Sequence, residues 1–475
     1  MLKEDIFTSL ITKAVTSKLL RKPILKQLEK RMRNTIVEKK SDVNLRSVQE
    51  KKFMFFNSMV QCAVKNLEKG YITPDVVKKM TRVLVRNQLV RDDASKETIK
   101  LFEEKHGQKP PSFLVFSPTQ KCNLKCIGCY ADSEACSNTS LPFETVDKIV
   151  GETFNVFGNR FMTISGGEPF MYNENGKTLF DIWEKYSDMF FLVYTNGTLI
   201  TPEAAKRLAE LGNVTLAISV EGTEKETDER RGAGVYKRIL EAFKNLREAG
   251  VPFGVSVTPT KKNYDTLMGE EFYDNLFEKE GVTYMWQFQL MPVGRGKEAF
   301  DLVVSPTQRV ELYKKWKQLI EEKQYCVADF WNSGVLSDGC VAYGRHGGFL
   351  YVDWDGKIMP CVFVPYYEDN IKDLYAEGKG LADAVFSNLM TRGRNWQKEY
   401  GLDNKKNPHN WLMPCSIRDH YENFRKNILT PEAKPENKEA KEALESEEYK
   451  EIMIEFDKET EKLTEPIWKE EYMKN

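Results

Sequence analysis

The spacing of apolar residues divides the chain into parts of different texture. Over the first 110 residues, apolar positions recur every three or four residues, the period of an amphipathic helix. Two such stripes are Phe7, Ile11, Ala14 and Val15, and Leu25, Leu28, Met32 and Ile36. We therefore expect residues 1–110 to form an N-terminal helical region, with docking on a membrane or on the substrate as its options.

Short β-rich runs alternate with amphipathic stretches between about residues 112 and 300. The predicted strands are Phe113–Ser117, Phe161–Ser165, Phe190–Tyr194, Val214–Ser219, Phe253–Val257 and Met285–Leu290. Strands that alternate with helices in this way indicate parallel β/α units. Because the chemistry of parallel β/α barrels lies at the C-terminal ends of the strands, the polar motifs that follow these strands are candidates for the functional site.

The last third of the chain is irregular and then highly charged. Residues from about 325 to 428 are rich in Gly, Asn, Trp and Cys, whereas residues 431–475 hold 15 acidic and 8 basic side chains. We expect an acidic tail over 429–475 that is helical or partly disordered.

Charge gives few hints about partners. The net charge is −1, which provides no general case for nucleic-acid binding. The first 40 residues carry 11 Lys and Arg against 4 Asp and Glu. Such a start predicts either a basic amphipathic helix on an anionic membrane surface or an ordinary helix with a solvated charged face. No apolar run approaches the ~18 residues of a membrane span, and the N-terminus lacks the pattern of a secretory signal. The expected location is cytoplasmic, with peripheral contact at the inner face of the membrane as an option.

Three cysteines follow the first predicted strand. Thr119–Tyr130 has the sequence TQKCNLKCIGCY, which places Cys122, Cys126 and Cys129 in a C-x3-C-x2-C pattern. Thiolates suit zinc or iron–sulfur clusters. A structural zinc site needs four ligands, and only three thiols with no nearby histidine are present here. Three thiolates on a four-iron cubane would leave one iron open, while a zinc site or unrelated thiols are the alternatives.

This pattern, with Tyr130 beside the last cysteine, resembles the radical SAM superfamily. The resemblance implies a partial (β/α)6 TIM-type barrel over 111–304 and a [4Fe–4S] cluster held by the three cysteines. The open iron would bind S-adenosylmethionine (SAM), and reductive cleavage of SAM would yield a radical that takes hydrogen from the substrate. Reduced flavodoxin or ferredoxin would supply the electron.

Further motifs occur in the order that the resemblance implies. Ser165–Pro169 has the sequence SGGEP, whose family counterpart binds the amino group of SAM. Glycines allow close backbone approach, and a carboxylate complements an ammonium. Later motifs would contact the ribose, the methionine part and the carboxylate of SAM. The expected cofactor-binding residues are Tyr130, Ser165, Gly166, Gly167, Glu168, Asn196, Ser219, Glu221 and Arg231.

A second cysteine group lies within residues 305–428. Cys340 and Cys361 bracket a predicted hairpin that turns at Asp355-Gly356, and Cys415 follows. The arrangement resembles the SPASM extension or its shorter twitch form, which implies an auxiliary [4Fe–4S] cluster held by these three cysteines. Its fourth ligand would be Cys326, His346, Asp419 or the substrate. Buried thiols or a zinc site are the alternatives.

The resemblance implies an enzyme that modifies an unactivated C–H bond oxidatively, with C–C bond or crosslink formation among the outcomes. Many peptide-modifying members carry an N-terminal winged helix with strands, whereas the first 110 residues here are predicted to be helical. We therefore favour a lipid or hydrocarbon chain as substrate, with a peptide or protein and then a small molecule as alternatives. A non-catalytic iron–sulfur sensor that binds SAM is a second class, although a sensor needs no ligands for an ammonium and a carboxylate.

Overall fold

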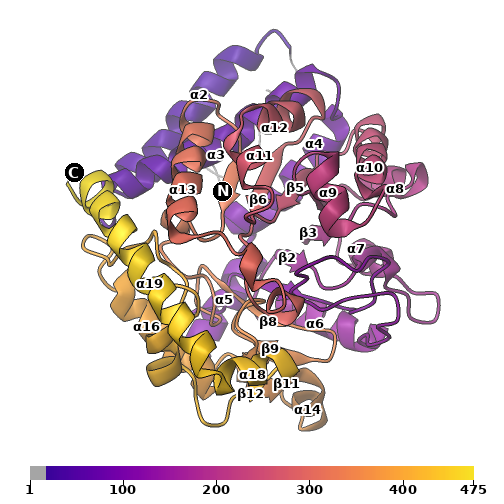
Figure 1. Cartoon of the computed structure of the whole chain (residues 1–475). Helices are drawn as coiled ribbons and strands as arrows, with labels where there is room; N and C mark the ends of the chain where they lie inside the picture. The colour runs from indigo at the N-terminus through magenta and orange to yellow at the C-terminus, as the bar shows by residue number, and fades with distance from the viewer. Residues whose placement is uncertain (1–17, 475) are drawn as a thin grey trace.

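The computed structural model describes residues 18–474 of the chain, and its first part is helical as predicted (Figure 1). The predicted helix around Phe7–Val15 lies outside the described residues. The N-terminal elements are α2 (Arg21–Arg33), the π-helix η1 (Asn34–Glu38), α3 (Arg46–Glu68), α4 (Pro74–Met80), the π-helix η2 (Thr81–Arg91) and α5 (Asp93–His106).

The apolar side of α2 is turned toward the protein. Leu28 and Met32 are buried in a cluster with Val37 and with Phe53 of α3. The described part of the basic N-terminal segment therefore uses its apolar face for packing, which gives no support to the expected membrane docking. Among the described residues, no helix combines the length and apolar character needed to cross a membrane.

A parallel sheet forms the centre of the molecule, and all six predicted strands are present in it. Its parallel strands lie in the order β8-β1-β2-β3-β4-β5-β6-β7. The strands are β1 (Phe113–Phe116), β2 (Phe161–Ile164), β3 (Phe190–Thr195), β4 (Val214–Ser219), β5 (Gly254–Val257), β6 (Tyr284–Gln287), β7 (Val327–Asp329) and β8 (Phe349–Val352).

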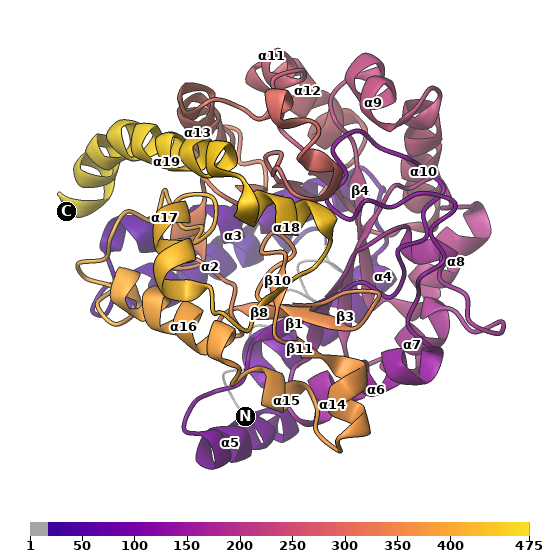
Figure 2. The same ribbon diagram turned by 60° about the horizontal axis from the view of Figure 1, so that its bottom comes forward.

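Helices connect the successive strands and cover the outside of the sheet (Figures 1 and 2). They are α6 (Phe143–Asn155), α7 (Leu179–Lys185), α8 (Pro202–Leu211), α9 (Glu224–Arg231), α10 (Val235–Ala249), α11 (Tyr264–Met268), α12 (Glu271–Asp274) with the π-helix η4 (Asn275–Lys279), and α13 (Pro306–Glu321). The fold is thus the predicted α/β class, a partial TIM-type barrel.

The sheet continues past the predicted boundary at residue 304. Strand β7 pairs with β6, and β8 pairs with β1 in parallel, so the second cysteine region supplies a strand at each end of the arc. The predicted hairpin also forms: β8 pairs antiparallel with β9 (Lys357–Met359), and Gly356 in its turn has φ +86°. The hairpin signal predicted the pairing of β8 with β9 but not the partner on its other edge.

The chain ends in short elements and two helices, the longer of which lies beside α13 (Figures 1 and 2). These are β10 (Tyr366–Tyr367), β11 (Asp369–Asn370), α14 (Ile371–Ala376), α15 (Leu381–Ala384), α16 (Asn388–Gln397), α17 (Tyr421–Asn423), β12 (Lys434–Pro435), α18 (Lys438–Glu445) and α19 (Glu447–Trp468), which continues as the π-helix η10 (Lys469–Met473). Met453, Trp468 and Tyr472 are buried. The charged segment is therefore helical, as predicted, and one of its faces packs on the body of the protein.

Candidate functional site

The first cysteine triad lies on the loop after β1, at the C-terminal end of the barrel strands. Cys122, Cys126 and Cys129 all line one large cavity of about 800 Å³. Burial, together with the negative charge of Glu168 and of the other two cysteines, raises the pKa of Cys122 to about 12. The Cys122 thiol is therefore protonated near neutral pH without a metal, and metal binding would displace its proton.

The glycine pair of the SGGEP motif packs directly against the cysteine loop. A Cβ at Gly167 would lie 2.3 Å from the carbonyl oxygen of Lys121, and Gly166 has φ +109°. Glycine is therefore required at 167, where a side chain would collide with the backbone, and is favoured at 166, where φ is positive. The motif therefore brings the end of β2 into contact with the loop that presents the thiols, which is the close approach expected from the sequence.

The Glu168 carboxylate faces the protein rather than the cavity. It is fully buried and accepts hydrogen bonds from Thr195 Oγ1 at 2.7 Å and from the Asn196 backbone N–H at 2.8 Å. The carboxylate thus ties the end of β2 to the end of β3. Its predicted contact with the amino group of SAM stays a prediction, because both of its oxygens already have protein partners.

Tyr130 and Asn196 connect the cysteine loop to the neighbouring strands. The Tyr130 hydroxyl donates to Ser165 Oγ at 3.0 Å and accepts from the Gly166 N–H at 3.2 Å. The Asn196 side chain donates to Asn123 Oδ1 at 2.8 Å, and its Nδ2 lies 3.8 Å from Cys122 Sγ. Tyr130, Ser165 and Asn196 line the cavity, so three of the predicted cofactor-binding residues lie beside the first triad.

A buried carboxylate organises the opposite wall. Glu221 Oε1 accepts from Arg231 Nε at 2.8 Å and also pairs with Arg230. Burial by itself lowers the pKa of Arg231, but the charges of Glu221 and Cys126 outweigh it, and the net pKa is raised. Arg231 is therefore charged, and its Nη1 lies 3.9 Å from Cys126 Sγ. Ser219 and both arginines line the cavity, whereas Glu221 lies behind them.

Two residues of the PVGR segment hold the cysteine loop, a role that the sequence did not reveal. Arg295 donates from Nε to the Cys126 carbonyl at 3.3 Å and from Nη2 to the Ser133 carbonyl at 2.7 Å. A Cβ at Gly294 would lie 2.3 Å from the Tyr130 carbonyl oxygen. The segment after β6 thus clamps the loop from outside. No local pattern in the sequence indicates this contact, because the partners are more than 150 residues apart.

Replacing Arg295 with alanine should therefore loosen the first triad. The variant loses the ion pair with Asp132 and two charged hydrogen bonds to backbone carbonyls, the latter each worth about 1.5–3 kcal/mol, so we expect faster loss of iron from the first cluster in the presence of a chelator. Lys297→Ala is the matched control, because Lys297 is two residues away and pairs with Glu442 instead. Equal rates of iron loss in the two variants would contradict the clamp.

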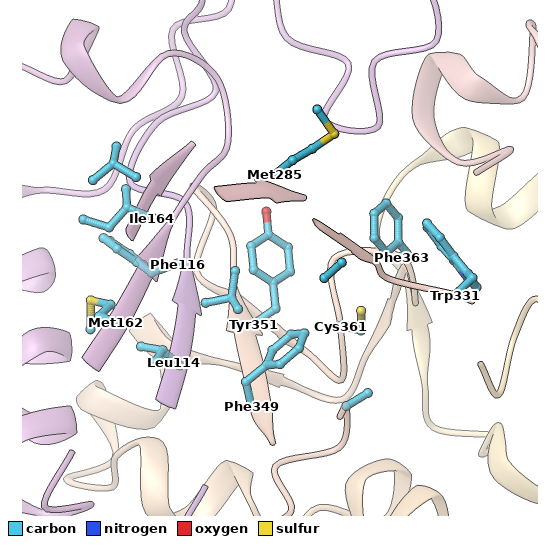
Figure 3. Close-up of a cluster of buried hydrophobic side chains, with 14 of the residues drawn as sticks. Leu114, Phe116, Met162, Ile164, Met285, Trp331, Phe349, Tyr351, Cys361 and Phe363 are labelled. Carbon is cyan, nitrogen blue, oxygen red and sulfur yellow. The ribbon is translucent and has the colours of Figure 1, made fainter. Parts of the chain in front are cut away.

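The second cysteine triad lines the same cavity. Cys340 precedes the hairpin, Cys361 follows β9, and Cys415 lies on a distant loop, yet all three reach the cavity wall. Burial raises the pKa of all three thiols, that of Cys415 to about 12. Figure 3 shows Cys361 near Phe363 and Trp331, whose ring centroids are 5.0 Å apart. The second triad therefore has an apolar, aromatic surrounding.

The three side chains considered as a fourth ligand of the second triad are engaged elsewhere. Asp419 pairs with the buried Arg309 and accepts from the Cys415 N–H at 3.0 Å. His346 Nδ1 bonds the Pro110 carbonyl, and Cys326, directly before β7, lies buried near Cys62. Of the described residues that line the cavity, none is one of these three. Asp419 instead positions Cys415, and the substrate is the one remaining option of the four.

The donor sets fit iron–sulfur clusters better than a single metal ion. Among residues 18–474, no three His, Cys, Asp or Glu side chains converge closely enough to hold one ion. A cubane distributes its ligands over different iron atoms, so its thiolates need not meet at one point. Each triad supplies three soft ligands on a shared wall, and the first has Ser165, Asn196, Ser219 and Arg231 beside it to bind polar groups of SAM.

Comparisons with known proteins agree with this arrangement. A sequence profile described as the Radical SAM superfamily matches residues 116–269. The mycofactocin maturase MftC of Mycobacterium tuberculosis is 30% identical over 306 residues, which cover 61% of this chain and 72% of the relative. An AdoMet-dependent heme synthase of Methanosarcina barkeri is 27% identical over 289 residues, with 55% of this chain and 80% of the relative covered.

Solved structures give a weaker likeness. A crystal structure of SuiB of Streptococcus suis bound to the precursor peptide SuiA superposes with a TM-score of 0.49 and 20% identity, over 63% of this chain and 70% of SuiB.

Proposed function

Because the chain belongs to the radical SAM superfamily, and is therefore an enzyme that uses a [4Fe–4S] cluster and SAM, we propose that it oxidises an unactivated C–H bond of a substrate held between two clusters. Cys122, Cys126 and Cys129 would hold the SAM-binding cluster. Cys340, Cys361 and Cys415 would hold an auxiliary cluster. One observation carries the proposal: all six thiols line a single cavity.

The protein's own residues would bind and orient the reactants. Arg231, kept charged by Glu221, would bind the carboxylate of SAM beside Cys126. Tyr130, Ser165 and Asn196 would form the polar wall on the other side of the first triad. When bound, the first cluster and SAM supply a carbon radical that removes a hydrogen atom, and the auxiliary cluster supplies an electron acceptor.

The relatives support a peptide as the first candidate substrate. The mycofactocin maturase is 30% identical to this chain, and its name describes maturation of a product, whereas neither relative reported above is named for a lipid. The maturase therefore favours the peptide alternative over the hydrocarbon chain that we expected from the sequence.

One observation favours a hydrocarbon chain as a second candidate. Among the described residues that line the cavity, the charged side chains are Arg230 and Arg231, and most of the remaining wall is aliphatic or aromatic. Apolar pockets bind ligands mainly by removing apolar surface from water. A substrate with a long apolar part would gain most from such a wall.

Both the chemistry and the substrate class can be tested with the reconstituted, anaerobic enzyme. With SAM and dithionite we expect 5′-deoxyadenosine, whose rate of formation should rise above the uncoupled rate in the presence of substrate. Peptide and lipid fractions of the source cells are added separately. Stimulation by the peptide fraction supports maturation, and stimulation by the lipid fraction supports the second candidate. No 5′-deoxyadenosine under any condition would favour the non-catalytic sensor and would end the proposal.

A further inference from the structure

The cavity extends far from the two cysteine triads, along the inside of the barrel. At the N-terminal ends of four neighbouring strands, Phe349, Phe113, Phe161 and Phe190 face it. Phe113 pairs in register with Phe349, and Phe161 with Phe190. Successive ring centroids along this series lie 5.1, 5.7 and 6.2 Å apart. These four side chains, the phenylalanine belt, mark the end of the cavity opposite the triads.

The N-terminal helices form the wall beyond the belt. Helix α3 presents one apolar stripe to the cavity, with the spacing of a single helical face. The stripe consists of Phe56, Met59, Val60, Ala63, Val64 and Leu67. Leu25 and Leu28 of α2 and Val77 and Met80 of α4 line the cavity as well. The N-terminal region thus has a direct place at the candidate site, although its apolar stripes did not identify the cavity as their partner.

The barrel interior is left open by its own side chains. A TIM-type barrel is normally filled by inward-pointing side chains, but Phe113, Tyr194 and Trp286 are only partly buried here. Gly254 lets the Tyr284 ring lie close against the strand, since a Cβ there would be 2.3 Å from that ring. Rings held against the wall leave the centre of the barrel available for a ligand.

Two of the polar groups in this part of the cavity, the hydroxyls of Thr215 and Tyr284, already have partners. Thr215 Oγ1 lies 3.0 Å from the Tyr284 hydroxyl, which also donates to the Leu216 carbonyl at 3.0 Å. Among the described lining residues, the two arginines lie at the cysteine end. A peptide main chain buried here would find only scattered hydroxyls, such as those of Thr163, Tyr194 and Ser256, for its many amide groups, and buried amides without partners are costly. A hydrocarbon chain has no such groups.

We propose that this part of the cavity is a channel for a long alkyl chain of the substrate, whose reacting carbon lies between the two cysteine triads. The channel is defined by the phenylalanine belt and the α3 stripe. The inference rests on the proposed function, because the channel ends at that site. The apolar cavity wall favours a substrate with a long alkyl chain, whereas the relatives favour a peptide. A free fatty acid and a membrane glycerolipid are the two sources of such a chain.

The test measures chain binding to the reconstituted enzyme by displacement of the fluorescent fatty acid cis-parinarate. Hexadecanoate should bind at least tenfold more tightly than octanoate, because each buried methylene adds roughly three- to fourfold. Ala63→Trp, which fills the channel, should weaken hexadecanoate binding at least tenfold. Gln61→Trp is the matched control on the same helix, because Gln61 does not line the cavity, and it should bind like wild type. In a second experiment, vesicles of dipalmitoyl phosphatidylglycerol replace hexadecanoate as the competitor of cis-parinarate. Displacement by the vesicles points to a membrane glycerolipid as the source of the chain, and displacement by hexadecanoate alone points to a free fatty acid.

Iron content and uncoupled SAM cleavage are measured in every variant, since both depend on the other end of the cavity. Val77→Trp on α4 replaces Ala63→Trp if the latter loses iron. Absence of hexadecanoate binding, or equal binding by all variants, overturns the channel. If the wild type binds hexadecanoate but forms no 5′-deoxyadenosine, the proposed function fails. If it forms 5′-deoxyadenosine but binds no chain, only the channel fails.

Discussion

Replacing Cys126 with alanine should abolish formation of 5′-deoxyadenosine at every substrate concentration. Cys126 is the middle thiol of the first triad, lies 3.9 Å from the Arg231 guanidinium and lines the cavity. Two remaining thiols cannot hold a four-iron cluster with one open iron, so SAM would have no site for reductive cleavage. Iron per chain should fall from about eight to about four, on the basis of two four-iron clusters. Iron analysis and chromatography of 5′-deoxyadenosine check both results.

Cys136→Ala is the control for this variant. Cys136 lies seven residues after Cys129, is exposed and contacts Glu134 instead of the cavity. It should keep full iron and full cleavage. If Cys126→Ala also cleaved SAM, the assignment of the first triad as cluster ligands would be wrong.

Replacing Cys361 with alanine should separate the two halves of the proposed reaction. Iron per chain should fall from about eight to about four, as in the first variant. Uncoupled 5′-deoxyadenosine formation should continue, because the first triad and Arg231 are unchanged. Oxidised product should be lost, because the second triad is the proposed site of the electron acceptor. Iron analysis, 5′-deoxyadenosine and product are measured on the same sample.

Cys326→Ala is the matched control, since Cys326 is also buried but lies directly before β7 and does not line the cavity. It should retain both clusters and product formation. An unchanged iron content in the Cys361 variant would contradict an auxiliary cluster at the second triad. It would leave the proposed SAM cleavage at the first triad unaffected.

The first triad and the strands around it could be predicted because their signals are local. Cys122, Cys126 and Cys129 lie within one short loop, and each strand from β1 to β6 is a continuous β-rich run. The polar motifs could be ordered because a parallel sheet brings the C-terminal ends of its strands together. The fold and the candidate residues near the first triad therefore followed from short stretches of sequence.

Long-range contacts were the part that the sequence could not predict. Arg295 holds the loop of Cys126 across 169 residues. The predicted contact of Glu168 with SAM stays a prediction, but the motif did not indicate that its carboxylate accepts hydrogen bonds from Thr195 and Asn196. A charged residue in a motif does not reveal which way its side chain points. The lining of the cavity by α3 was missed for a similar reason, since an apolar stripe predicts burial without naming the partner.

The pairing of β8 with β1 has a consequence for how the protein is made. Phe113 and Phe349 are neighbours in the sheet. During synthesis, more than 230 further residues must therefore be added after β1 before β8 can pair with its second edge. Pairings this distant in sequence slow folding, and an uncovered strand edge invites association with other chains. A nascent chain that lacks β8 would therefore expose an unpaired edge of β1. We expect ribosome-bound fragments that end before β8 to need chaperones more than the complete protein does.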